Sequence, residues 1–155
     1  MNILKILTPR RRLGDFGERK AARYLRFRGY RILERNYIGK HGEIDIIARK
    51  NNIVAFVEVK TRNTASLSLY EARPAASVTP EKQRRLIRIA DEYARRTHKP
   101  PQCWMRMDIV EVYTTTDKKG NSKVEKIKHI ENAFDLNSAY DKKYQYIRQK
   151  ERSNL

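Results

Sequence analysis

Two strand-like segments separated by a pair of asparagines constrain the fold of this chain more than any other feature. Residues 42–48 alternate polar and apolar side chains, and residues 53–60 are β-branched and apolar almost to their end, so both are predicted to be β-strands. Asn51 and Asn52 between them are typical of a tight turn. The segments therefore predict an antiparallel hairpin whose register is set by its turn.

The predicted register brings two carboxylates together. If Asn51 and Asn52 form the loop, Lys50 lies opposite Ile53, and counting back along the ladder places Asp45 opposite Glu58. Like charges on opposed residues destabilise a strand pair, and apolar neighbours on the same face add a cost for removing both carboxylates from water. A hard divalent cation such as Mg²⁺ or Mn²⁺, bound through oxygen ligands, offsets both costs.

A second interpretation of the hairpin is an ordinary surface charge network. The same register places Glu43 opposite Lys60, so Asp45, Glu58 and Lys60 are also compatible with solvated ion pairs on a half-exposed ribbon. Short charge patterns recur by chance, and the spacing alone leaves both interpretations open. A slip of one residue would move Asp45 to the opposite face from Glu58, so the metal hypothesis depends on the register.

The charge of the chain points to a polyanionic partner. The 155 residues are of the size of a single domain, and 35 Lys and Arg against 18 Asp and Glu give a formal net charge of +17. Nucleic acid is the leading candidate partner, although this balance alone favours a binding protein over an enzyme. The sequence contains no Gly-rich phosphate loop and no Gly-x-Ser-x-Gly turn, which argues against ATP-driven and serine-nucleophile chemistry.

The compartment is inferred from cysteine use and from the N-terminus. Cys103 is the only cysteine and so has no partner for an internal disulfide, which fits a reducing environment. The apolar residues 1–7 are too few to cross a membrane, and arginines follow where a signal peptide would be cleaved. We therefore expect a cytoplasmic protein with no membrane association and with a flexible basic leader at residues 1–12.

A helix is predicted before the hairpin, over residues 13–28, because Ala21, Ala22 and Leu25 fall on one face at helical spacing. Glu18 lies on the same face and has two interpretations. It could be a third acidic residue of the hairpin site, or an ion at the edge of the apolar stripe that pairs with an arginine. Spacing alone favours the second interpretation.

The rest of the chain predicts a mixed α/β pattern. A second helix is expected over residues 80–96, with Thr79 as its N-cap and Pro80 in its first turn. Further strands are expected at residues 30–37, 104–113 and 123–130, a long loop at 61–79, and a charged helical extension at 135–155. Asp108, in the strand 104–113, is expected to be a buried partner of an arginine.

One face of the second predicted helix is strongly basic. It carries Lys82, Arg85 and Arg88, and solvated helix faces more often mix both signs of charge. Side chains of this kind can lie along a phosphate backbone. Together with Arg62, which follows the hairpin, these residues are predicted to hold phosphates that flank a reacting bond.

Five ordered blocks resemble a known family. They are GERKAARYL (17–25), GYRILERN (29–36), GEIDIIA (42–48), FVEVKTR (56–62) and VTPEK (78–82). In this order they resemble the UPF0102 or YraN family, which is similar in turn to archaeal Holliday junction resolvases and to the restriction-endonuclease-like PD-(D/E)xK nucleases. The resemblance spans residues 13–134, and several ordered blocks are more specific than one short pattern.

The resemblance implies a fold and roles for individual residues. The fold is a restriction-endonuclease-like α/β domain, with a mixed central sheet flanked by helices over residues 13–134 and an extra C-terminal helix. Asp45 and Glu58 would hold the metal, Lys60 would act beside them, and Glu18 would be an accessory acid from the first helix. This last role follows from the family likeness and not from spacing.

The resulting hypothesis is a Mg²⁺- or Mn²⁺-dependent DNA endonuclease. Asp45, Glu58 and the carbonyl of Val59 would hold one or two ions, and Lys60 would position the attacking water or neutralise developing charge. Branched DNA is a candidate substrate and a homodimer a candidate assembly, because junction cutting needs two sites. RNA ranks below DNA as a partner. The rivals are a non-catalytic nucleic-acid-binding protein on the same scaffold and a basic assembly factor that contacts ribosomal RNA.

Overall fold

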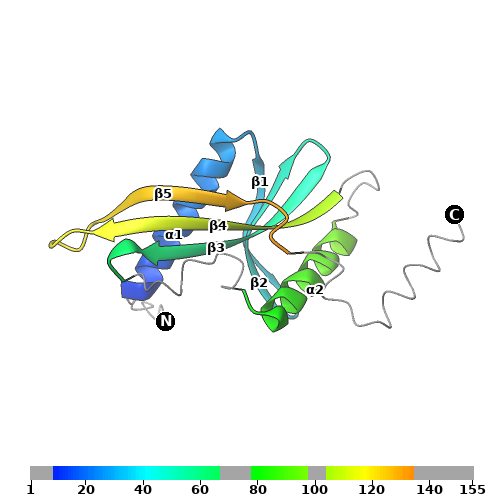
Figure 1. The fold of residues 1–155 in the computed structure, drawn as a ribbon. Helices are drawn as coiled ribbons and strands as arrows, with labels where there is room; N and C mark the ends of the chain where they lie inside the picture. Colours follow the sequence, from blue (N-terminus) through cyan, green and yellow to red (C-terminus); the bar gives the residue numbers. More distant parts are fainter. Residues whose placement is uncertain (1–8, 67–77, 98–103, 135–155) are drawn as a thin grey trace, which may run out of the picture.

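A five-stranded mixed β-sheet with one helix on each face forms the framework of the protein (Figure 1). The computed structural model describes residues 9–66, 78–97 and 104–134. The expected α/β fold with a mixed central sheet is confirmed, and the arrangement is consistent with a nuclease-like scaffold. The predicted helical extension at 135–155 and most of the long loop after the hairpin lie outside the described residues.

The elements follow one another as a helix, a three-stranded unit, a second helix and a final hairpin. Their bounds are α1 Pro9–Phe27, β1 Arg31–Gly39, β2 Gly42–Lys50, β3 Ile53–Asn63, the short 3₁₀ helix η1 Thr64–Ser66, α2 Pro80–Arg96, β4 Trp104–Thr116 and β5 Ser122–Ile130. The strands are ordered β1-β2-β3-β4-β5 in the sheet, with β3 and β4 parallel and the other neighbours antiparallel. The two parallel strands need a long crossover connection, and the helix α2 lies in it.

The register of the β2–β3 hairpin agrees with the sequence prediction as far as the ladder extends. Lys50 pairs with Ile53, and the pairing continues to Ile46 and Val57, the last partners before Asp45 and Glu58. Asn51 has a φ of 53°, a left-handed conformation that asparagine tolerates in tight turns. Along this paired stretch, the side chains of β2 and β3 therefore lie on the faces that the count from the turn predicted.

The core has two parts, one on each face of the sheet. On one face, Ile47 and Phe56 pack with Ile87 of α2, and on the other, Ile46 and Val57 pack with Leu25 of α1. Each helix supplies an apolar stripe and leaves its charged side chains at the surface. Because both faces are covered, the central strand β3 is buried from Val54 to Glu58.

The strands and α1 differ in their bounds from the sequence expectation, and the differences are largest for α1, β3 and β4. The helix α1 begins at Pro9, four residues before the expected start, so the arginines at 10–12 belong to its first turns. Proline is well tolerated at the start of a helix because the first N–H groups need no partner within the helix. The strand β3 continues to Asn63, because it pairs with β4 as far as Thr114.

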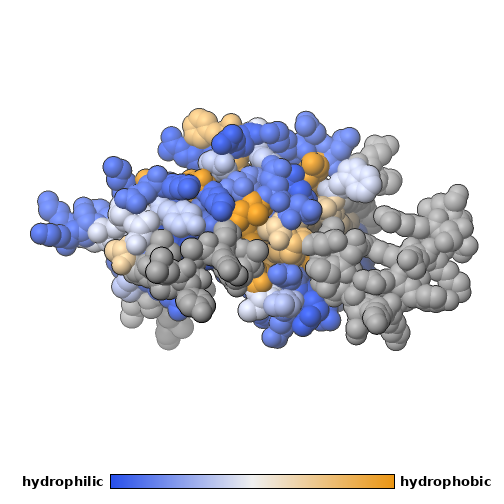
Figure 2. All heavy atoms as spheres, in the orientation of Figure 1, coloured by the Kyte–Doolittle hydropathy of each residue, from blue (hydrophilic) through white to orange (hydrophobic). Residues whose placement is uncertain are grey.

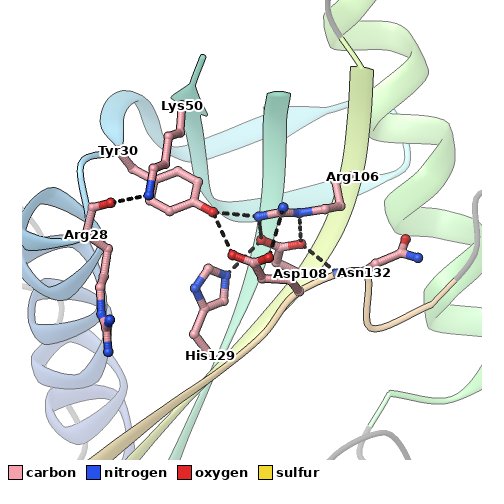
Figure 3. Close-up of polar contacts among 8 residues, drawn as sticks. Arg28, Tyr30, Lys50, Arg106, Asp108, His129 and Asn132 are labelled. Atoms are coloured by element: carbon pink, nitrogen blue, oxygen red, sulfur yellow. Dashed lines mark hydrogen bonds and ion pairs between the residues drawn. The ribbon is translucent and has the colours of Figure 1, made fainter. Parts of the chain in front are cut away.

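A buried polar network joins β4 to the end of β5 (Figure 3). Asp108 is fully buried, accepts hydrogen bonds from Arg106 Nε and from the backbone N–H of Asn132, and bonds His129 Nε2 at 2.8 Å. The prediction that Asp108 is a buried partner of an arginine is confirmed. Burial acts to raise the pKa of Asp108, but the hydrogen bonds from His129 and Arg106 outweigh it and lower this pKa. The network therefore has a structural role as a satisfied internal ion pair.

Hydrophilic residues make up most of the coloured surface in Figure 2, including the end at which the turn between β4 and β5 projects, and hydrophobic residues show near the centre of the view. Among the described residues, no helix is long and apolar enough to cross a membrane.

Candidate functional site

Acidic residues from three elements and lysines from two come together near the point where β2 and β3 separate. Glu18 comes from α1, Asp45 from β2, Glu58 and Lys60 from β3, and Lys82 from the first turn of α2. We call these five residues the acidic site. The structure thus brings together all four residues that the sequence and the family resemblance predicted to be catalytic, and it adds Lys82.

Asp45 lies at a break in the alternation of β2. Ile44 and Ile47 both pack on the α2 side of the sheet, whereas Ile46 packs on the α1 side, and strict alternation would have placed Ile44 with Ile46. On the neighbouring strand β1, Asn36 lies between the residues paired with Ile44 and Ile46 and has a φ of 51°. The backbone is therefore irregular on both strands at the level of Asp45.

The break lets the carboxylate of Asp45 bind the neighbouring strand. Its Oδ2 accepts a hydrogen bond of 2.7 Å from the backbone N–H of Val59. Because the N–H groups of a strand lie in the plane of the sheet, this carboxylate also lies close to that plane, between the two faces. The ladder between β2 and β3 ends at Ile46 and Val57, so the expected pairings of Asp45 with Glu58 and of Glu43 with Lys60 are not part of it. On the other side of β2, Glu43 pairs with Ile38 of β1.

Glu58 is the most buried acid of the site, with 6% of its side chain exposed. It lies on the same face as Phe56, toward α2. Its Oε1 contacts Lys60 Nζ at 3.0 Å and also accepts a short hydrogen bond from Lys82 Nζ. Two ammonium groups therefore share one carboxylate oxygen, and together they offset the cost of burying the charge.

The ionisation of Asp45 is strongly perturbed. Burial, followed by the negative charge of Glu58, raises the pKa of Asp45 to about 7, while the hydrogen bond from Val59 opposes the shift. Lys82 also opposes it. A carboxyl group that releases its proton near neutral pH is a recognised mark of a functional site.

Glu18 acts on Asp45 from the α1 side of the sheet. Its negative charge contributes to the raised pKa of Asp45, and its own pKa is raised by burial and by the charge of Asp15. A hydrogen bond with Asn36 opposes this shift. Asn36 therefore links the irregular position on β1 to the accessory acid, a role that the sequence analysis did not foresee because asparagine in a strand carries no distinctive pattern.

The position of Glu18 depends on a close approach between α1 and β3. Gly17 is buried, and a Cβ atom at this position would lie 2.9 Å from the Cβ atom of Thr61 and would overlap its hydroxyl oxygen. Glycine is therefore required here for α1 to lie against β3. The same contact places the next residue, Glu18, where its charge acts on Asp45.

The carboxylates of Asp45 and Glu58 fit a hard divalent cation. Oδ2 of Asp45 accepts the N–H of Val59, and Oε1 of Glu58 contacts both lysines. Among the described residues, the other oxygen of each carboxylate has no hydrogen-bond partner. Carboxylate and backbone carbonyl oxygens are the ligands that Mg²⁺ and Mn²⁺ take. Within the described parts of the chain, no three Asp, Glu, His or Cys side chains gather closely enough to hold a metal ion, so Glu18 is not a ligand in this arrangement.

The predicted phosphate-binding residues divide into two kinds. Arg85 and Arg88 are exposed on α2, as a role in binding nucleic acid requires. Arg62 is only 14% exposed and its Nε contacts the buried carboxylate of Glu111 at 3.3 Å, so its charge is largely matched inside the protein. Lys82 lies in the acidic site itself. Sequence reasoning missed its contact with Glu58, because residues 24 positions apart give no local signal.

Comparison with known proteins places the same part of the chain in one family. The family model described as "Uncharacterised protein family UPF0102" matches residues 17–112, which include every residue of the acidic site. A UPF0102 protein of Caldicellulosiruptor saccharolyticus is 43% identical over 81% of this chain and 98% of its own length. A UPF0102 protein of Chlorobium phaeobacteroides is 42% identical over 79% of this chain and 93% of its own length.

Proposed function

The chain belongs to the UPF0102 family, and from the acidic site that it carries we propose that it hydrolyses phosphodiester bonds of DNA with the help of Mg²⁺ or Mn²⁺. The observation that supports this proposal is the convergence of Asp45 and Glu58 from neighbouring strands beside the ammonium groups of Lys60 and Lys82. In metal-assisted phosphoryl transfer, carboxylates bind the metal ion and a fixed cationic group stabilises negative charge on the phosphate.

In this proposal, Asp45, Glu58 and the carbonyl of Val59 hold the divalent ion. The bound ion would polarise the phosphoryl oxygen and lower the pKa of a bound water. Lys60 lies on the same face of β3 as Glu58, so its ammonium is fixed beside the reacting phosphate and neutralises charge that develops there. Glu18 acts from the α1 side on the ionisation of Asp45.

DNA is the proposed substrate because of the charge of the protein. The net charge of +17 and the exposed arginines of α2, which follow Lys82 along the helix, suit a polyanion. Arg85 and Arg88 would hold phosphates on either side of the reacting bond without reading bases. Branched DNA is the first structured substrate to test. Cutting a junction requires two active sites, so this substrate also implies a homodimer of the protein.

The test is a panel of branched, nicked, single-stranded and linear DNA substrates incubated with Mg²⁺ or Mn²⁺. Glu58→Ala should lower the cleavage rate by about a thousandfold or more, because it removes a metal ligand, while DNA affinity is retained. Glu125→Ala, which removes the same charge from an exposed position on β5, is the matched control and should cleave normally. Cleavage by Glu58→Ala at the rate of the control would overturn the proposal.

A second candidate function is nucleic-acid binding without catalysis on the same scaffold. The observation that favours it is the pair of lysines on Glu58, since two ammonium groups already offset the buried charge without a metal. This function predicts salt-sensitive binding and no product whose formation depends on Mg²⁺ or Mn²⁺. The same substrate panel separates the two functions.

A further inference from the structure

Lys82 reaches the acidic site from the helix α2, outside the β2–β3 hairpin. It lies in the first turn of α2, and its Nζ donates to Glu58 Oε1, the oxygen that Lys60 also contacts. The side chain of Lys82 is 33% exposed, whereas that of Glu58 is almost fully buried. Lys82 therefore connects a buried metal-ligand candidate to the surface on which Arg85 and Arg88 lie.

The start of α2 fixes the backbone of Lys82. Thr79 caps the helix by accepting the N–H of Lys82 on its Oγ1 at 3.3 Å, and Pro80 sets the first helical turn. A lysine in the first turn faces the positive end of the helix dipole, which is unfavourable for a cation. The contact with Glu58 and the nearby charge of Asp45 offset that cost, so the lysine is held toward the site.

The acidic site carries opposed charges without a metal. When ionised, Glu18, Asp45 and Glu58 carry three negative charges against the two positive charges of Lys60 and Lys82, which both contact Glu58. A divalent ion added to these five groups leaves one positive charge in excess. Excess positive charge in a partly buried site is costly, and a phosphate group is the ligand that would reduce it.

We propose that Lys82 is an internal counter-ion of the acidic site, which holds Glu58 in the metal-free protein and leaves it for a phosphate of the nucleic acid when a divalent ion binds. Lys60 cannot make this exchange as readily, because it lies two residues from Glu58 on the same face of the same strand. Lys82 comes from a separate helix, whereas the two side chains are similarly exposed, at 33% for Lys82 and 26% for Lys60. The inference rests on the proposed function in one respect, that a divalent ion binds at Asp45 and Glu58.

The first test measures metal binding by isothermal titration calorimetry with Mg²⁺ and Mn²⁺ in the absence of DNA. Lys82→Gln should bind the ion about tenfold more tightly than the wild type, because the competing hydrogen bond to a charged group is gone. Arg84→Gln is the matched control, since it removes the same charge from an exposed position two residues along α2. Equal affinity in the two variants, weaker binding by Lys82→Gln, or a wild type that binds no ion would overturn the inference.

The second test uses the wild-type protein and so does not depend on how a variant folds. Lysine acetylation by an activated ester, followed by mass spectrometry, should show faster labelling of Lys82 when Mg²⁺ is added, because its ammonium leaves Glu58. Lys123, exposed on β5, should label at the same rate in both conditions. Unchanged labelling of Lys82 at saturating Mg²⁺ would contradict the exchange. Neither test measures cleavage, so a protein that exchanges Lys82 but cuts no DNA would refute the proposed function alone.

Discussion

At the scale of single residues, Asp45 combines a fixed position with a perturbed ionisation. The hydrogen bond from Val59 N–H holds its carboxylate near the plane of the sheet, and burial beside Glu58 raises its pKa to about 7. An aspartate in the unfolded chain has its ordinary pKa of 3.8. Between these two values the folded protein binds more protons than the unfolded chain, so its free energy of unfolding falls as the pH rises.

This linkage predicts how Asp45→Asn changes stability in metal-free buffer. The asparagine keeps an oxygen for Val59 N–H but does not ionise. Between pH 5 and pH 7, the free energy of unfolding of the wild type should therefore fall by about 2 kcal/mol more than that of the variant. Urea unfolding in the presence of a chelator at both pH values measures the difference. A difference in stability that does not change with pH would show that Asp45 ionises in the folded protein as it does in the unfolded chain.

At the scale of elements, the position of α1 against β3 depends on Gly17. Gly17→Ala should destabilise the protein by about 1–3 kcal/mol, because the new methyl group overlaps the side chain of Thr61. This loss exceeds the gain of about 0.5–1 kcal/mol expected from replacing glycine inside a helix. Thermal or denaturant unfolding measures the change, and a shift of α1 would also move Glu18 away from Asp45.

Two further variants test the cause of this effect. Gly14→Ala, on the same helix but with no atom near the added methyl group, should stabilise the protein instead. The cost of Gly17→Ala should be smaller in a Thr61→Ala background, because part of the overlap is removed. If Gly17→Ala proves as favourable as Gly14→Ala, the close approach of α1 to β3 does not control the packing.

At the scale of the whole molecule, the charge of +17 controls association with polyanions. Each phosphate that a lysine or arginine neutralises on duplex DNA changes the slope of log affinity against log salt by about 0.9. The double variant Arg85→Gln/Arg88→Gln should therefore reduce the magnitude of this slope by about two relative to the wild type. Fluorescence anisotropy with a labelled duplex at several salt concentrations provides the measurement.

The control for the salt experiment lies on a different part of the surface. Lys123→Gln/Lys126→Gln removes the same total charge from exposed positions on the edge strand β5 and should leave the slope almost unchanged. Equal reductions in the two double variants would show that DNA binds through the general charge of the molecule and not through α2.

Local signals in the sequence predicted much of the framework. Thr79 and Pro80 fixed the start of α2, and the Asn51-Asn52 turn fixed the register of the hairpin, because caps and two-residue turns depend on neighbouring residues only. The start of α1 was less accurate, since the apolar stripe that marks this helix does not reach its first turn. The acids were found from the hairpin count and the family likeness.

The sequence by itself determined the hairpin register, the two helices and the identity of the acids. Only the tertiary structure decided that Asp45 turns into the plane of the sheet, that Glu18 is held where its charge acts on Asp45 by the approach of α1 at Gly17, and that Lys82 binds Glu58. The physical reason is the range of the interactions. Register and caps depend on residues a few positions apart, whereas the charge balance of the site depends on elements that meet only when both faces of the sheet are covered.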